Sequence, residues 1–356
     1  MPMNRSVLDI DAAAETDRIV RWLRENMRGL HRSGAVLGIS GGIDSSVCLA
    51  LCVKAFGPER VVALLLPEKD SDPVSEDLAR MLAAHYGVTP VLEVITPALD
   101  GYACYERRDE AIARVFPEYD AKAGYKAKIV LPPGLLEQGT LNIYSLTIIT
   151  PDGEEKSVRL PPPEFAQIVA ASNFKQRTRT AMLYYHAELR NFAVIGTPNK
   201  NEHDQGFFVK YGDGGVDLKP VVHLYKTQVY QLARYLDVPE IIQKRTPTSD
   251  TYSAPATQEE FFFRLPFAIM DLLWYAQEHQ VSLEDTAEAL DMTPAQVGNA
   301  FDDFTRKTRS THYLRTPPLD MTSLGSPIPD GRRLKAGATL RALDPAEGEW
   351  RDLRDL

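Results

Sequence analysis

A glycine-rich turn between an apolar strand and an apolar helix constrains the fold of this chain more than any other feature. Residues 35–39 form a short apolar run, Ser40-Gly41-Gly42 follows, and residues 45–56 have the pattern of a buried helix. Further strands are expected at 61–66 and 91–95, with a helix between them. This alternation predicts an α/β fold with a doubly wound, Rossmann-like parallel sheet, in which ligands bind beyond the carboxyl ends of the strands.

The pattern changes twice along the rest of the chain. Between residues 101 and 163 the sequence becomes polar and aromatic, and two segments at 141–149 and 156–160 flank Pro151-Asp152-Gly153 and predict a β-hairpin. Helix and strand patterns then resume, with a helix at 174–190, a strand at 192–195 and a helix at 226–236, and three helices are expected at 261–276, 282–290 and 294–308. We therefore expect a nucleotide-binding domain made of residues 1–100 and 164–257, an insertion at 101–163, and a C-terminal helical region with a tail at 258–356.

Charge and cysteine content exclude several classes of function. The net charge of −9 leaves no broad basic surface for nucleic acid or an anionic membrane. The first residues lack the apolar core of a signal peptide and no run of 18 apolar residues occurs, so we expect a cytoplasmic protein with no membrane partner. The cysteines, Cys48, Cys52 and Cys104, have no CxxC spacing and are predicted to be reduced core residues rather than redox or metal groups.

The glycine turn has the composition of an anion site. It consists of Gly38, Ile39, Ser40, Gly41, Gly42, Ile43, Asp44, Ser45 and Ser46. Glycines let the backbone N–H groups approach a phosphate, and the start of the next helix adds a favourable dipole. Asp44 would repel that phosphate unless a divalent cation lay between them, which argues for Mg²⁺. The alternative is a structural turn in which Asp44 only caps the helix.

The string SGGIDSS resembles the loop of the N-type ATP pyrophosphatases, a superfamily that includes NAD, GMP and asparagine synthetases. The resemblance implies that residues 38–46 bind ATP, that ATP is cleaved to AMP and pyrophosphate, and that Asp44 holds Mg²⁺. It leaves open which oxygen atom is activated.

Later segments resemble the NAD synthetase family. Gly196-Thr197 to Glu202 is similar to its GTxxxxE stretch, which implies that Thr197 contacts ATP and Glu202 is the second magnesium ligand; without the resemblance, Glu202 reads as a first-turn helix residue. The segment from Lys210 to Asp217 is close to KYGDGGxD, which implies contacts of both end residues with deamido-NAD. By the same resemblance, Lys226 and Thr248 contact ATP, and Arg177 lies on the dinucleotide. Arg177 and Arg179 are two positions apart, so only one is expected to face the ligand.

The resemblance implies a ligase reaction that forms a C–N bond. A nicotinate carboxylate is adenylated by ATP, and ammonia then displaces AMP to give NAD. Asp44 and Lys226 are the expected catalytic groups, and Asp213 is a candidate for the proton of ammonia. Only 39 residues precede Ser40, too few for a glutaminase domain, so free ammonia or a separate glutaminase is expected to supply nitrogen. A homodimer is also implied.

Three departures from the family pattern keep an alternative open. These are the long insertion, Gln258-Glu259-Glu260-Phe261 in place of an acidic pair with LGxxY, and His312-Tyr313-Leu314-Arg315 where the family has a His-Lys substrate contact. Only His312 or Arg315 could serve at that last place. The alternative is an amide synthetase of the same superfamily acting on another carboxylate, and a further one is a non-catalytic nucleotide-binding protein.

Two features of the C-terminal region have more than one interpretation. Residues 282–309 resemble a helix-turn-helix, but Asp302 and Asp303 on the second helix oppose DNA binding, so a packed helical hairpin is predicted. The run Phe261-Phe262-Phe263 fits either a subunit interface or the core.

Overall fold

The computed structural model describes residues 3–131, 134, 136, 143–248, 252–255, 257–319, 341–343 and 350–352. Contacts between Cα atoms group Met1–Arg315 into one compact unit and Thr316–Leu356 into a second. In the second unit, strands β8 (Arg341–Leu343) and β9 (Trp350–Asp352) pair antiparallel. All other elements belong to the first unit.

A parallel sheet forms the centre of the first unit and confirms the doubly wound α/β prediction. Its strands are β1 (Ala35–Gly38), β2 (Val61–Leu65), β3 (Val91–Leu92) and β7 (Ala193–Val194), in the order β3-β2-β1-β7. Every pairing in it is parallel. Because side chains alternate along a strand, Leu37 and Val36 of β1 enter separate cores on the two faces.

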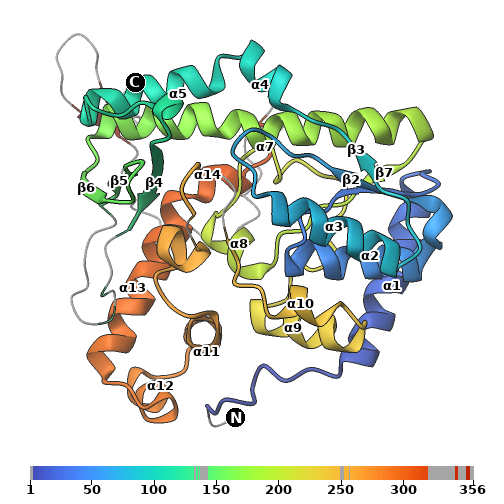
Figure 1. Ribbon diagram of the computed structural model, residues 1–356. Coiled ribbons are helices and arrows are strands. Elements are labelled where there is room, and N and C mark those ends of the chain that lie inside the picture. The colour runs from blue at the N-terminus through green and yellow to red at the C-terminus, as the bar shows by residue number, and fades with distance from the viewer. Residues whose placement is uncertain are drawn as a thin grey trace. The chain divides into compact units, whose positions relative to one another are not determined.

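Helices cover both faces of this sheet. The core that contains Leu37 is completed by α1 (Ala12–Gly29), α2 (Ile43–Phe56), α3 (Pro73–His85) and α9 (Lys226–Tyr235). The core that contains Val36 is completed by α4 (Thr96–Gly101), α5 (Cys104–Val115) and the long helix α7 (Pro162–Arg190). Figure 1 shows α5 and α7 side by side.

The expected hairpin is present, but it belongs to a larger sheet. Strands β5 (Ser145–Ile149) and β6 (Glu155–Arg159) pair antiparallel, and a third strand, β4 (Lys126–Val130), adds to β5. Residues 141–142 of the expected first strand lie outside the described residues. The sheet buries Ile129 and Ile148 against Ile112 of α5 and Ile168 of α7, so this part of the chain has its own apolar core.

The C-terminal helices differ from expectation at one place. The prediction of a single helix at 261–276 is wrong, because two separate elements occupy this segment. A π-helical turn, η3 (Glu259–Phe263), ends at Arg264, which has φ +66°, and a new helix, α11 (Phe267–Glu278), begins after it. Pro266 explains the break, because proline has no N–H group to continue the helix. Phe262 and Phe263 are buried among these helices, which places them in the core.

The helices α12 (Leu283–Leu290) and α13 (Pro294–Ser310) form the predicted hairpin, packed through Leu290, Val297 and Phe304. The remaining helical elements are short: η1 (Pro58–Arg60), η2 (Ala121–Ala123), α8 (Lys200–Gln205), α10 (Glu240–Gln243) and α14 (His312–Arg315). Among the described helices, none is both long and apolar enough to cross a bilayer.

The three cysteines are buried and unpaired with one another, as predicted for reduced core residues. Burial raises the pKa of the Cys52 thiol to about 12, so it is a neutral, unreactive group at physiological pH.

Candidate active site

The glycine turn links β1 to α2 and is fixed from within. The Ser45 hydroxyl donates to the carbonyl oxygen of Gly42 at 3.0 Å, and the Ser46 hydroxyl donates to the same oxygen at 2.8 Å. The hydroxyl protons of Ser45 and Ser46 are therefore both donated to the backbone of the turn itself. The turn ends on the first residues of α2, where Asp44 lies in the first helical turn.

Gly41 is required by its surroundings. Its φ is +68°, and a Cβ atom there would lie 2.7 Å from the Cβ of Leu78 and 3.0 Å from the carbonyl oxygen of Ser75, both on α3. Any side chain must therefore displace the turn or the helix behind it.

We expect Gly41→Ala to weaken ATP binding at least tenfold and to lower the melting temperature, because the clash adds to the cost of a positive φ for a non-glycine residue, roughly 1–3 kcal/mol. Gly87→Ala is the matched control, since Gly87 has φ +70° and open space where a Cβ atom would lie. Calorimetric titration with ATP and a thermal melt of both variants check this. Equal ATP affinity in the two variants would contradict the steric argument.

Asp44 lies at the centre of a buried polar cluster. Its Oδ2 accepts a hydrogen bond from the Lys226 Nζ at 2.5 Å, and its Oδ1 accepts one from the Asn199 Nδ2 at 3.0 Å. The Lys226 side chain is 0% exposed. Burial opposes its charge, but the neighbouring Asp44 and Glu202 carboxylates outweigh burial and raise the Lys226 pKa. A fixed ammonium group therefore lies beside the glycine turn.

Glu202 is held close to Asp44 by the start of α8. Asn199 caps this helix by accepting a hydrogen bond from the Glu202 N–H at 3.1 Å, and the Glu202 Oε2 accepts one from the Asn199 N–H at 3.0 Å. Gln258 donates to the other carboxylate oxygen at 3.3 Å. Burial and the negative charge of Asp44 raise the pKa of Glu202. Two carboxylates so close in a buried place favour a cation between them.

The donor set at this point fits magnesium. Asp44 and Glu202 line one cavity of about 160 Å³ together with Ser40, Thr197 and Thr248. The described parts of the chain contain no cluster of three or more His, Cys, Asp or Glu side chains that could hold a metal ion. Mg²⁺ is typically held by one or two carboxylates, with water and substrate phosphates completing the shell, and this pair matches that requirement.

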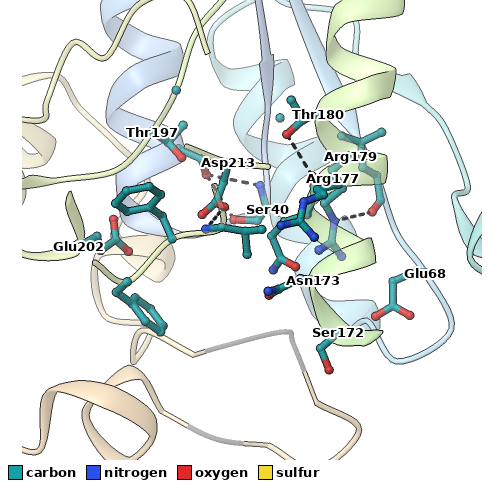
Figure 2. Close-up of a pocket in the computed structure, with 18 of the residues that line it drawn as sticks. Ser40, Glu68, Ser172, Asn173, Arg177, Arg179, Thr180, Thr197, Glu202 and Asp213 are labelled. Atoms are coloured by element: carbon teal, nitrogen blue, oxygen red, sulfur yellow. Dashed lines mark hydrogen bonds between the residues drawn. The ribbon is translucent and has the colours of Figure 1, made fainter. Parts of the chain in front are cut away.

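A larger cavity of about 940 Å³ adjoins the turn and brings together most of the residues singled out in the sequence. Of these, Gly38, Ile39, Ser40, Ser45, Arg177, Thr197, Glu202, Lys210, Asp213 and Thr248 line it. Figure 2 shows Ser40, Thr197 and Asp213 on one side and the arginines of α7 on the other. Residues that follow different strands of the sheet thus meet in one pocket, as expected for a doubly wound fold.

Both Arg177 and Arg179 border this cavity, and the expectation that only one of them faces the ligand stays a prediction. Ser172, Gln176 and Leu183 of α7 line it, which marks a stripe along the helix. Arg177 and Arg179 lie at opposite edges of this stripe, and both line the cavity. Arg179 donates to the Leu66 carbonyl oxygen at 3.2 Å, whereas Arg177 donates to the Lys210 carbonyl oxygen at 3.3 Å.

Two predicted substrate residues lie elsewhere. Asp217 and His312 are not among the residues that line the cavity. Asp217 instead accepts hydrogen bonds from the Tyr184 hydroxyl at 3.1 Å and the Val194 N–H at 2.8 Å, and so ties its loop to β7. Beside His312, Tyr313 lines the cavity, and the Lys210 Nζ lies 4.1 Å from the centre of its ring.

Asp213 lines the cavity as an exposed residue. Its Oδ1 accepts a hydrogen bond from the Val209 N–H at 2.8 Å, and partial desolvation of the carboxylate by its surroundings raises its pKa to about 6. A group of this kind is ionised at neutral pH and close to the range in which it can take up a proton.

A buried ionic network behind the cavity has no counterpart in the motifs of the sequence. The Lys175 Nζ donates to Glu68 at 2.9 Å and to Asp70 at 2.7 Å, and Arg108 of α5 also pairs with Asp70. Glu68 lines the cavity. Lys175 and Glu68 are 107 positions apart, so no local pattern could have joined them. The network fixes the segment after β2 against α5 and α7.

The inserted sheet also reaches the cavity. Tyr144, just before β5, stacks on Phe165 of α7 with ring centres 4.7 Å apart, and both line the cavity with Tyr252 and Phe261. This part of the wall is aromatic, in contrast to the charged wall near Asp44.

Comparisons with known proteins agree with this geometry. The sequence profile of the family described as NAD synthase matches residues 15–123 and 149–318. The unmatched stretch between them contains β4 and Tyr144. An NH(3)-dependent NAD(+) synthetase of Rhizobium meliloti (strain 1021) is 49% identical over 87% of this chain and 92% of its own length. One of Mesorhizobium japonicum is 48% identical over 90% of this chain and 99% of its own length.

Solved structures show the same fold. The NH3-dependent NAD synthetase of Campylobacter jejuni has a TM-score of 0.58 at 21% identity, with 88% of this chain and 100% of that chain covered. An NAD+ synthetase of Burkholderia pseudomallei has a TM-score of 0.51 at 26% identity, with 86% and 93% covered. The matched profile, the curated relatives and the paired carboxylates beside the glycine turn lead to one assignment: this chain belongs to the NAD synthase family.

Proposed function

We propose that this chain is an ammonia-dependent NAD synthetase, a ligase that uses ATP to convert the nicotinate carboxylate of deamido-NAD into the amide of NAD. The observation that carries the ATP half of this proposal is the convergence of Asp44, Glu202 and Lys226 at the glycine turn. The relatives at 49% and 48% identity support the acid substrate, and they favour it over another carboxylate.

In the first step, a carboxylate oxygen of deamido-NAD attacks the α-phosphorus of ATP. An O–P bond forms, the bond to the bridging oxygen breaks, and pyrophosphate leaves with its electron pair. Lys226 faces the departing phosphates with a fixed positive charge, and the N–H groups of residues 40–46 approach them at the start of α2. Asp44 and Glu202 would hold Mg²⁺, which when bound neutralises phosphate charge.

In the second step, ammonia attacks the carbonyl carbon of the adenylate and AMP leaves. The nitrogen must then lose a proton, and we assign Asp213 as its acceptor because this carboxylate lines the cavity with a pKa of about 6. Thr197 and Thr248 are assigned to ATP, and Arg177 and Lys210 to the dinucleotide, since all four line the cavity. Contacts of Asp217 and His312 with the substrate stay predictions.

The same proposal includes a division of the chain into a domain of residues 1–100 and 164–257, an insertion at 101–163 and a C-terminal region at 258–356. It also includes a homodimer and a cytoplasmic location, where ATP and the dinucleotide meet. The ammonia is either free or supplied by a separate glutaminase.

The direct test incubates purified protein with ATP, Mg²⁺ and ammonium and measures pyrophosphate release with and without deamido-NAD. We expect release to require deamido-NAD and to stop when EDTA removes the metal. Release driven by a different carboxylic acid would favour the amide synthetase alternative, and no ATP turnover with any acid would favour a non-catalytic protein.

Arg177→Ala is expected to raise the KM for deamido-NAD about tenfold, because a hydrogen bond to a charged group contributes roughly 1.5–3 kcal/mol and each 1.4 kcal/mol is tenfold in affinity. The KM for ATP should change less than twofold. Arg114→Ala is the matched control: this partly exposed arginine also contacts α7, through Glu164 and Gln167, but does not line the cavity. Steady-state kinetics with each substrate varied in turn decide the matter, and a parallel rise of both KM values would refute the assignment.

A further inference from the structure

One face of α11 carries three side chains that the proposed reaction does not use. Phe267, Asp271 and Glu278 are four and seven positions apart, a spacing that places them on the same side of a helix. All three contact the residues around Lys226 of α9 or Glu202 of α8, although α11 belongs to the C-terminal helices.

Asp271 joins the two helices that carry the active-site charges. Its side chain is 0% exposed. One carboxylate oxygen accepts a hydrogen bond from the Thr227 N–H at 2.8 Å, and the other accepts one from the Asn201 side-chain amide. Thr227 directly follows Lys226, and Asn201 directly precedes Glu202. One carboxylate therefore spans the first turns of α8 and α9.

Glu278 repeats this arrangement two turns later along α11. One of its oxygens accepts a hydrogen bond from the Lys200 Nζ at 2.8 Å, and the other accepts one from the Tyr225 hydroxyl. Lys200 opens α8, and Tyr225 is the residue before α9. Each of the two carboxylates thus takes one donor from the α8 side and one from the α9 side.

Phe267 completes the face at the active site. The centre of its ring lies 5.2 Å from the Lys226 Nζ. The ring and the Asp44 carboxylate together limit where the buried ammonium group can lie.

We propose that α11 braces the catalytic centre, with Asp271 and Glu278 as positioning residues that set the spacing of Lys226 and Glu202. The inference rests on the proposed function, because that spacing matters only if both groups act on one metal-bound triphosphate. A displacement of about 1 Å in such a centre can lower a rate on the order of a hundredfold. Without the brace, fewer contacts would fix the start of α8 relative to the start of α9.

The chain offers a matched control. Asp303 is another fully buried carboxylate of the C-terminal helices, but it pairs with Lys307 at 2.7 Å and lies 4.0 Å from Arg264. It contacts neither α8 nor α9 through these groups. Asp271→Ala and Asp303→Ala therefore remove the same charge from the same core, and only the first removes the bridge.

The test compares these two variants with the wild type, with circular dichroism to confirm folding. For Asp271→Ala we expect kcat to fall at least tenfold, the Mg²⁺ concentration for half-maximal activity to rise at least fivefold, and the KM for deamido-NAD to stay within twofold. Asp271→Asn should recover most of kcat, because an amide can still accept from Thr227. Asp303→Ala should lose thermal stability and leave the Mg²⁺ dependence unchanged.

Calorimetric binding of ATP with and without Mg²⁺ supplies a readout that does not depend on the acid substrate. Mg²⁺ raises the affinity of the wild type for ATP by some factor, and in Asp271→Ala this factor should be at least fivefold smaller. This result is expected even if deamido-NAD proves to be the wrong acid. If Asp271→Ala does not fold, Glu278→Gln, at a partly exposed site, should show the same shift to a smaller degree. The proposal is overturned if folded Asp271→Ala, or Glu278→Gln in its place, binds Mg²⁺ and ATP like the wild type, or if Asp303→Ala shows an equal shift.

Discussion

Asp44→Asn is expected to lower the rate of pyrophosphate release about a thousandfold while the protein stays folded. The amide keeps the shape of the side chain but removes the negative charge that faces Lys226 at 2.5 Å and that we assign to Mg²⁺. Loss of one electrostatic group in a catalytic centre typically costs 10²–10³ in rate, and here a metal ligand is lost with it. Single-turnover measurement of pyrophosphate release at several Mg²⁺ concentrations checks the prediction.

Asp303→Asn is the control for this variant. Asp303 and Lys307 form another buried carboxylate–ammonium pair, 2.7 Å apart, and neither residue lines the two cavities beside the glycine turn. The Asp303→Asn variant should be less stable than the wild type, with little change in its rate of pyrophosphate release. Near-normal activity of Asp44→Asn with an unchanged metal requirement would show that the metal assignment is wrong.

Lys226→Met is expected to lower kcat/KM for ATP by about 10²–10³. Methionine fills a similar volume in this fully buried place but presents no charge to the leaving pyrophosphate. The loss should appear in the adenylation step, which exchange of labelled pyrophosphate into ATP measures directly. The second step, reaction of ammonia with the adenylate, should change little.

Lys307→Met matches this substitution in burial and chemistry. Lys307 is 3% exposed and pairs with Asp303. Because it does not line the cavity, its loss should leave pyrophosphate exchange within threefold of the wild type. Exchange at the wild-type rate in Lys226→Met would remove this lysine from the mechanism.

Local patterns were sufficient to predict the parts of the fold that bind ATP. The strand at 35–39 and the helix at 45–56 have dense apolar signals, and a glycine turn between them has few other conformations. Strand β4 (Lys126–Val130) was not among the expected elements, although its first residues alternate lysine with apolar side chains. The turn at Pro151 indicates a hairpin of two strands, and no local signal shows that a third strand pairs with β5. Helix α7 starts at Pro162, well before the helix expected at 174–190, because proline, which breaks the interior of a helix, is well tolerated in a first helical turn.

The site itself was only partly accessible from sequence. Motifs that resemble a family indicated Asp44, Thr197, Glu202 and Lys226, and the structure brings these four around one cavity. Asp271 was not found, since it lies in an apolar helix and its partners are 44 and 70 positions away. Hydrogen bonds between buried polar groups far apart in the chain produce no periodic pattern in the sequence, so only the structure reveals which residues form them.

The contact between Asp44 and Lys226 joins positions 182 residues apart, which has a consequence during synthesis. The turn that receives the triphosphate leaves the ribosome early, but the ammonium group that completes it follows roughly 10–40 s later at ordinary rates of translation. By the proposed mechanism, a nascent chain therefore cannot cleave ATP before Lys226 has left the ribosome, although the glycine turn has emerged well before that point.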